Sequence, residues 1–163
     1  MENGRIQIYT GNGKGKTTAA LGLCFRALGS SLTVRVLQFR KNKKCGEHAE
    51  AERVGLQIML CPGGRTGGIC DNPCPLLAEA RRLLADNTDL LVLDEIMAAI
   101  ACGCVSVDEV LALLDGAAGA AEIVMTGRDA PGELIERADL VTNMKSVKHY
   151  FSRGVPAREG IEY

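Results

Sequence analysis

Several features are scarce in this 163-residue chain, and each scarcity argues against a class of protein. Tryptophan is absent and aromatic residues make up 4% of the sequence, so few flat side chains could stack on bases. The net charge is −1, without the basic excess typical of nucleic-acid binders, so we expect no nucleic-acid partner. The longest uncharged run near the centre, 96–105, is far shorter than the roughly 20 residues of a membrane span, so we expect no membrane partner either.

Cysteine, in contrast, is abundant. The chain has seven cysteines, and this odd number, with no apolar signal segment after Met1, favours a reducing cytoplasm over a secreted disulfide scaffold. Cys45, Cys61, Cys70 and Cys74 fall in two irregular stretches and could bind zinc or an iron–sulfur cluster. Because no pair of cysteines has C-x₂-C spacing, we favour free thiols and keep a metal-binding module as an alternative.

Short apolar runs alternate with amphipathic segments, which is typical of an α/β fold with a mainly parallel sheet. The length suits one domain covering residues 1–163. The nearly continuous apolar character of the strands predicts that helices cover both faces of the sheet. About six strands are expected, at 5–9, 33–39, 56–60, 89–93, 122–126 and 140–144.

Helices are expected between these strands. After the first strand, Leu21, Cys24, Phe25 and Leu28 recur at helical spacing and should form one buried face. Residues 76–84 show the same period, and Ser106 with Glu109 fits a capping box that begins another helix. Pro131 suits the first turn of a short helix ending near Ala138. The stretches 40–46 and 61–75 are expected to be loops, and 145–163 has no clear period.

The run TGNGKGKTT, between the first strand and the first helix, is a glycine-rich phosphate loop with one unusual position. The common pattern is G-x-x-x-x-G-K-[ST], and a Thr stands where its first Gly is expected. Backbone N–H groups of such a loop bind phosphate oxygens, helped by the positive end of the following helix. The alternative is a turn that is Gly- and Lys-rich by chance. The predicted nucleotide-binding residues are Thr10, Gly11, Asn12, Gly13, Lys14, Gly15, Lys16, Thr17 and Thr18.

Within this loop Lys16 would supply a positive charge, and the hydroxyl of Thr17 would be a Mg²⁺ ligand. A second ligand is predicted at Asp94, since carboxylates at the carboxyl end of an apolar strand lie where open α/β sheets bind ligands. Glu95 could order water, metal or substrate. The alternative for both acids is an ordinary solvated strand end.

Two further stretches carry positive charge. Arg128 follows Thr126 and Gly127 just past another strand, and its planar guanidinium could reach a phosphate, although a surface arginine is the alternative. The basic run 40–44 could attract nucleotide phosphates, although a solvated face is the commoner role of such a run.

These motifs resemble the ATP:corrinoid adenosyltransferases of the CobA/BtuR type. The off-consensus loop 9–20, the strand 36–39 (VLQF), the blocks 91–95 and 126–128, and the tail blocks 138–142, 147–149, 154–155 and 160–163 follow the family in order. The resemblance implies a P-loop NTPase-like (RecA-like) fold and transfer of the 5′-deoxyadenosyl group of ATP to Co(I) of a corrinoid. It implies Lys16, Thr17, Glu95 and Arg128 as catalytic residues, with ATP bound in the reverse sense along the loop, to which Thr10 would be suited.

The resemblance also implies an external reductant for cobalt and suggests a homodimer. The segment 61–70 has no aromatic residue, so corrinoid-facing residues are not carried over from the family. Another phosphate-loop enzyme, a small kinase or an ATPase, is the alternative within the same fold. A GTPase is disfavoured, because the guanine-binding signature Asn-Lys-x-Asp is absent.

Overall fold

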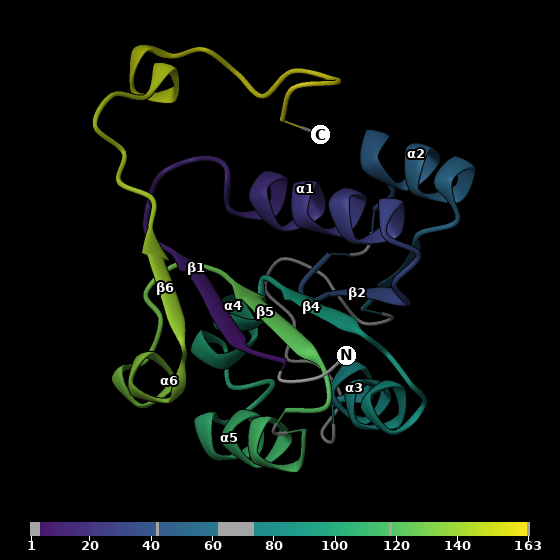
Figure 1. Ribbon diagram of the computed structural model, residues 1–163. Coiled ribbons are helices and arrows are strands. Elements are labelled where there is room, and N and C mark those ends of the chain that lie inside the picture. Colours follow the sequence, from purple (N-terminus) through teal and green to yellow (C-terminus); the bar gives the residue numbers. More distant parts are fainter. Residues whose placement is uncertain (1–3, 42, 62–73, 118, 163) are drawn as a thin grey trace.

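The computed structural model describes residues 4–41, 43–61, 74–117 and 119–162. A six-stranded sheet forms its centre, every pairing in it is parallel, and the strand order is β3-β2-β4-β5-β1-β6 (Figure 1). This confirms the predicted α/β fold and its parallel sheet. The strands are β1 (Ile6–Thr10), β2 (Val34–Gln38), β3 (Gln57–Leu60), β4 (Leu90–Asp94), β5 (Glu122–Thr126) and β6 (Leu140–Asn143).

Helices lie on both faces of the sheet. In Figure 1, α1 and α2 lie on one face, and α3, α4 and α5 lie on the other, while α6 lies near β6 at the edge. A short 3₁₀ helix, η1 (Tyr150–Arg153), follows β6. The helices are α1 (Lys16–Gly29), α2 (Gly46–Val54), α3 (Pro75–Ala85), α4 (Ile96–Ala101), α5 (Val107–Gly116) and α6 (Gly132–Arg137).

The central strand β4 shows how the two layers form. Successive side chains of a strand point to opposite faces. Leu91 and Leu93 belong to the apolar cluster shared with α3, α4 and α5, whereas Leu90 and Val92 belong to the cluster shared with α1 and α2. All five residues of β4 are buried, so this strand needs apolar side chains on both faces.

The edge strands depart from that expectation. All four residues of β6 are exposed, and β3 alternates between exposed and half-buried residues. The prediction that helices cover both faces is therefore correct for the central strands and wrong for the edge strands β3 and β6. A strand pattern in the sequence does not reveal which strands lie at the rim of a sheet.

The buried face of α1 also differs from the prediction. The helix buries Lys16, Ala20, Cys24 and Ala27, whereas Phe25 is 68% exposed. Small side chains allow α1 to lie close to the sheet, and Leu21 and Leu28 are only half-buried beside them. The helical period was correct, but the face was assigned to the larger side chains.

Several local predictions were correct or need small changes. The Ser106 capping box is present, with Glu109 N donating to Ser106 Oγ at 3.1 Å and Ser106 N donating to the Glu109 carboxylate at 2.8 Å. Pro131 caps α6 from just outside its first turn. Two helices were not predicted, α2 and the six-residue α4. Most of the predicted loop 61–75 lies outside the described residues, and within the described ranges no helix is long and apolar enough to cross a membrane.

Candidate nucleotide-binding site

The phosphate loop joins the end of β1 to the start of α1. Gly15 precedes α1 with a φ of 116°, and Gly11 has a φ of 101°, both in the left-handed region that favours glycine. A Cβ at Gly11 would lie 2.4 Å from Asn143 Oδ1, which leaves no room for a side chain. The N–H of Gly13 donates to the carbonyl of Met144 at 2.7 Å, so the chain beyond β6 supports the loop.

Thr10, the unusual residue of the motif, is the last residue of β1. Its side chain is turned away from the loop, and its Oγ1 accepts a hydrogen bond from the N–H of Ala130 at 3.3 Å. The backbone conformation that demands glycine falls one residue later, at Gly11. The protein therefore needs no glycine at position 10, and the threonine there ties the loop to the segment after β5.

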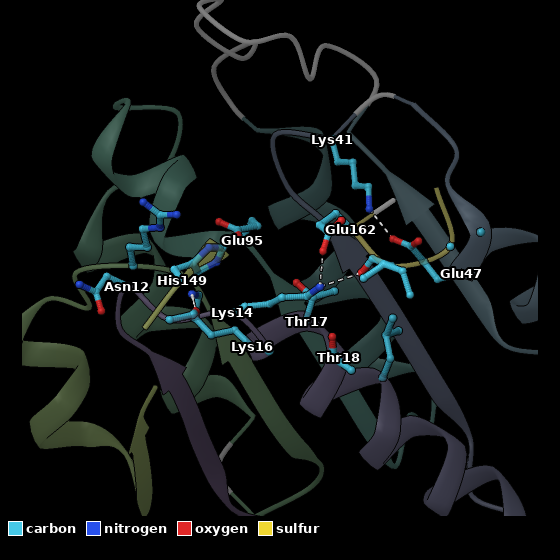
Figure 2. A pocket seen from close by; sticks show the side chains of 17 residues that line it. Asn12, Lys14, Lys16, Thr17, Thr18, Lys41, Glu47, Glu95, His149 and Glu162 are labelled. Carbon is cyan, nitrogen blue, oxygen red and sulfur yellow. Dashed lines mark hydrogen bonds and ion pairs between the residues drawn. The ribbon is translucent and has the colours of Figure 1, made fainter. Parts of the chain in front are cut away.

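A cavity of about 640 Å³ opens in front of this loop (Figure 2). It contains most of the predicted residues, namely Asn12 to Thr18 with Glu95 and Arg128. Thr10, Gly11 and Asp94 are not among its lining residues. Its lining also includes Lys41 of the basic run 40–44, and residues that the sequence did not single out for nucleotide binding: Leu21, Gly46, Glu47, His149, Gly160, Ile161 and Glu162.

Lys16 is buried at the base of this cavity. Its Nζ donates to the carbonyls of Gly11 and Gly13, each at 2.8 Å. Burial lowers the pKa of the ammonium, and the nearby Arg128 lowers it further, whereas Glu95 and Asp94 oppose this change. Two neutral carbonyls are weak partners for a buried cation, and a phosphate oxygen would form a stronger, charge-assisted hydrogen bond.

Asp94 lies behind Thr17 and accepts hydrogen bonds from three side chains. Thr17 Oγ1 donates to its Oδ1 at 2.9 Å, Thr126 Oγ1 donates to the same oxygen at 2.6 Å, and Gln38 Nε2 donates to Oδ2 at 3.0 Å. The hydroxyl of Thr126 also accepts from the backbone N–H of Glu95 at 2.9 Å. Donors on both oxygens fix the orientation of the carboxylate.

A buried chain of hydrogen bonds continues from Asp94 to α2. The Nδ1 of His48 accepts from the N–H of Cys45 at 2.9 Å, which leaves its Nε2 as the donor to Gln38 Oε1 at 2.8 Å. Gln38 then presents its amide N–H to Asp94. His48 is 4% exposed and Gln38 is fully buried. Sequence reasoning missed both residues, since only tertiary contacts bring them to the acid.

Glu95 follows β4 directly and lines the cavity. Its φ of 59° places a non-glycine residue in the left-handed region, a costly conformation that turns the chain from β4 into α4. Burial raises the pKa of its carboxyl, and the neighbouring Asp94 raises it further, while Lys16 and Arg128 act in the opposite direction. Strain and a shifted pKa in a cavity are typical of functional residues.

Arg128 also lines the cavity, because of the turn before it. Gly127 has a φ of 145°, and a Cβ there would lie 2.5 Å from Met97 Cβ, so only glycine allows this approach to α4. This turn at Gly127, immediately after β5, directs the chain past the phosphate loop. The structure thus brings Arg128 to the same cavity as Lys16 and Glu95.

The basic run 40–44 divides between the cavity and the surface. Lys41 lines the cavity and forms an ion pair with Glu47 at the start of α2. Lys44 pairs with Glu52 at 2.7 Å, and both side chains are about 70% exposed. Lys41 thus lies at the cavity, paired with Glu47, whereas Lys44 belongs to the solvated surface.

None of the cysteines among the described residues forms a disulfide. Cys102 Sγ lies 3.1 Å from Cys104 Sγ, and burial raises the pKa of Cys102 and Cys74. Among the described residues, no group of three or more His, Cys, Asp or Glu side chains could hold a metal ion. Cys70 lies outside the described residues, so a metal site that includes it stays an untested alternative.

A glycine-rich loop between the first strand and first helix, with an acidic residue bonded to its threonine, defines a phosphate-loop nucleotide-binding protein. The chain belongs to the ATP:corrinoid adenosyltransferase family BtuR/CobO/CobP, whose model matches residues 2–163. It is accordingly an adenosyltransferase of cobalamin biosynthesis or salvage that uses ATP and a corrinoid as substrates.

Similar proteins support this assignment. The chain is 35% identical to corrinoid adenosyltransferase CobA of Salmonella typhimurium, over 99% of this chain and 87% of that protein. It is 37% identical to a corrinoid adenosyltransferase of Pseudomonas aeruginosa, over 99% and 85% of the two chains. The flagellar accessory protein FlaH of Methanocaldococcus jannaschii shares the fold, with a TM-score of 0.64 at 17% identity over 88% and 72% of the two chains.

Proposed function

We propose that residues 1–163 act as one domain that binds the triphosphate of ATP on the loop 10–18 and transfers the 5′-deoxyadenosyl group to Co(I) of a corrinoid. The observation that carries the proposal is the shared cavity, in which the loop residues Asn12 to Thr18 meet Glu95 and Arg128. Groups from three strand ends thereby surround one space of a size suited to a nucleotide.

The reaction is a substitution at the ribose 5′-carbon. Co(I) of the corrinoid substrate supplies the electron pair, a Co–C bond forms, and the C5′–O bond breaks as inorganic triphosphate leaves. Cobalt becomes formally Co(III) in the alkylated corrinoid, which leaves as the product. A reductant outside this chain must therefore reduce the cobalt of each new corrinoid substrate to Co(I) before it reacts. Since cobalt is the nucleophile, the protein needs none of its own and must align the reactants and stabilise the leaving group.

Lys16 and Arg128 are the cations that would stabilise charge developing on the leaving triphosphate. Lys16 is buried against neutral carbonyls, and Arg128 lines the same cavity. Donors already in position cost little reorganisation when charge develops, and removing one such donor lowers turnover by about 10²–10³. Glu95, beside both cations, would order a water molecule or the substrate.

The donor set at Thr17 and Asp94 fits Mg²⁺. The hydroxyl and the carboxylate lie within hydrogen-bond distance of each other, and both offer the oxygen ligands that this cation prefers. Thr17 would bind the ion directly, and Asp94 would hold it directly or through water. When bound, Mg²⁺ would neutralise part of the triphosphate charge.

The orientation of ATP is part of the proposal. Family resemblance suggests that the triphosphate runs in the reverse sense along the loop. Thr10 would then act by holding the loop to Ala130, because its hydroxyl is bonded there rather than to the cavity. A bound structure with ATP in the ordinary orientation would contradict this part. A homodimer and a cytoplasmic location remain expectations from resemblance and cysteine content.

One experiment distinguishes the proposed reaction from its alternatives. The protein is mixed anaerobically with ATP, Mg²⁺ and chemically reduced cobalamin, and the spectrum and phosphate product are followed. A light-sensitive Co–C species with triphosphate supports the proposal. Formation of ADP would indicate a kinase or ATPase, and bound zinc or iron without product would indicate a binding module.

The matched variants are Lys16→Ala and Lys44→Ala. Lys16→Ala should lower turnover by about 10²–10³, the cost of losing one preorganised donor. Lys44→Ala removes an exposed lysine paired with Glu52 and should leave turnover unchanged. Full activity in Lys16→Ala would refute the role given to Lys16.

A further inference from the structure

The segment 158–162 returns from the far side of β6 to the phosphate loop. In Figure 1 the yellow chain leaves β6, passes through η1 and runs back above α1. Gly160, Ile161 and Glu162 line the nucleotide cavity beside the loop. We call residues 158–162 the strap. Its last three residues form part of the cavity wall, and none of the strap residues was predicted to bind nucleotide.

The strap is joined to the phosphate loop through Lys14. Lys14 Nζ donates to Glu162 Oε1 at 2.8 Å (Figure 2) and to the carbonyl of Ile161 at 3.0 Å. It also donates to the hydroxyl of Tyr150 at 2.9 Å. An ammonium has three donors, so these acceptors satisfy the whole group. The three N–H donors of Lys14 therefore bond to the strap and to Tyr150, whereas Lys16 lies at the base of the cavity.

Glu162 is the centre of this contact. Besides Lys14, its carboxylate accepts from the backbone N–H of Arg158 at 2.7 Å, from the Arg158 guanidinium at 3.2 Å and from the hydroxyl of Tyr150. These contacts with Arg158, Lys14 and Tyr150 lower the pKa of Glu162, so it is ionised at neutral pH.

The charges of this group explain why an acid is tolerated beside a triphosphate site. One carboxylate is shared by two cations, so Lys14, Arg158 and Glu162 together carry a net charge of about +1. The Arg158 guanidinium also lies over the Tyr150 ring, 4.9 Å from its centroid, which holds the strap to η1. The closed strap thus presents a positive rim to an anionic ligand.

We propose that Glu162 is a positioning residue that closes the strap over bound ATP through Lys14, making residues 160–162 a wall of the nucleotide site. The inference depends on the proposed ATP site, since the strap encloses that cavity. It assigns Lys14 a role distinct from Lys16: Lys14 holds the strap, and Lys16 contacts the triphosphate.

The test measures ATP binding by calorimetry in the absence of corrinoid, with Glu162→Ala and Glu162→Gln. Both variants should weaken ATP binding, Glu162→Ala by about tenfold, while turnover at saturating ATP changes less than about twofold. Glu52→Ala, which breaks the exposed pair with Lys44, is the control and should bind ATP like the parent protein. Equal affinity in Glu162→Ala and the parent would overturn the inference, whereas no ATP binding by the parent would contradict the proposed function itself.

A double-mutant cycle separates a strap contact from a direct phosphate contact. If Lys14 acts through Glu162, then Lys14→Ala should not weaken ATP binding further in a Glu162→Ala background. Additive losses would show that Lys14 contacts ATP directly and would overturn the role assigned to it.

Amide hydrogen exchange reports the strap itself. Residues 158–162 should exchange more slowly when ATP is bound, and Glu162→Ala should abolish that protection. Faster exchange on ATP binding would mean that nucleotide displaces the strap, contrary to the proposal.

Discussion

Thr17 Oγ1 donates a hydrogen bond of 2.9 Å to Asp94 Oδ1, joining the first turn of α1 to the end of β4 across 77 positions of sequence. The strand β5 separates β1 from β4 in the sheet, and Thr126 at its end donates to the same oxygen. The contact therefore spans three neighbouring strand ends. It holds together the two oxygen atoms that we propose as Mg²⁺ ligands.

The hydroxyl of Thr17 should matter more than its methyl group. Thr17→Ala removes one of the two proposed Mg²⁺ ligands and should lower turnover by about 10²-fold and raise the Mg²⁺ concentration needed for half-maximal activity. Thr17→Ser keeps the hydroxyl and should retain most activity. A Mg²⁺ titration of adenosyl transfer measures both variants, and equal titration curves for Ala and Ser would contradict the ligand role.

Gln38 should be essential for the orientation of Asp94. Gln38→Leu removes the Nε2 donor to Asp94 Oδ2 and leaves His48 Nε2 without its acceptor Gln38 Oε1. Each unsatisfied buried group costs about 1–3 kcal/mol, and a misoriented Asp94 should also weaken Mg²⁺ use. Chemical denaturation and the same Mg²⁺ titration give the two readouts. Gln57→Leu, on the exposed side of β3, is the control. A stable, fully active Gln38→Leu variant would show that the chain of hydrogen bonds does not position the acid.

Glu95 should make stability depend on pH. Its carboxyl has a raised pKa in the folded protein, so the folded state favours the protonated form more than the unfolded state does. The contribution of Glu95 to folding stability is therefore fully present below the ordinary pKa of a glutamate. It is lost as the pH rises through the raised pKa of the folded state. Glu95→Gln, which cannot ionise, should become progressively more stable than the parent protein from about pH 4 upward, and the difference should level off above the folded pKa.

Denaturation of both proteins across this pH range measures the difference, and Glu136→Gln on the exposed side of α6 provides a matched control. Turnover of Glu95→Gln should fall although its stability rises, a combination typical of a functional group held in a strained site. A difference that shrinks as pH rises would have the wrong sign for this explanation.

The sequence predicts those parts of the site that depend on local spacing. The loop 10–18 and the acids after β4 occupy fixed positions relative to a strand and a helix, so their motifs are visible without tertiary structure. Gln38, His48 and the strap residues could not be found in this way, since they reach the site only when distant segments fold together. Glu162 lies 148 positions from Lys14, and no spacing rule connects such a pair.

Helix α1 shows a different limit, which a pair of variants can test. Helical periodicity showed that α1 has an apolar side, but it did not show which line of residues on that side packs against the sheet. In the structure Cys24 is buried, whereas Phe25 is 68% exposed. Cys24→Ser places a hydroxyl in an apolar cluster and should cost about 1–3 kcal/mol, whereas Phe25→Ser should change stability by less than about 0.5 kcal/mol. Urea denaturation compares them. A larger loss of stability for Phe25→Ser than for Cys24→Ser would mean that a partner or a second copy of the chain covers Phe25 in solution. The buried face of α1 would then be the one that the sequence predicted.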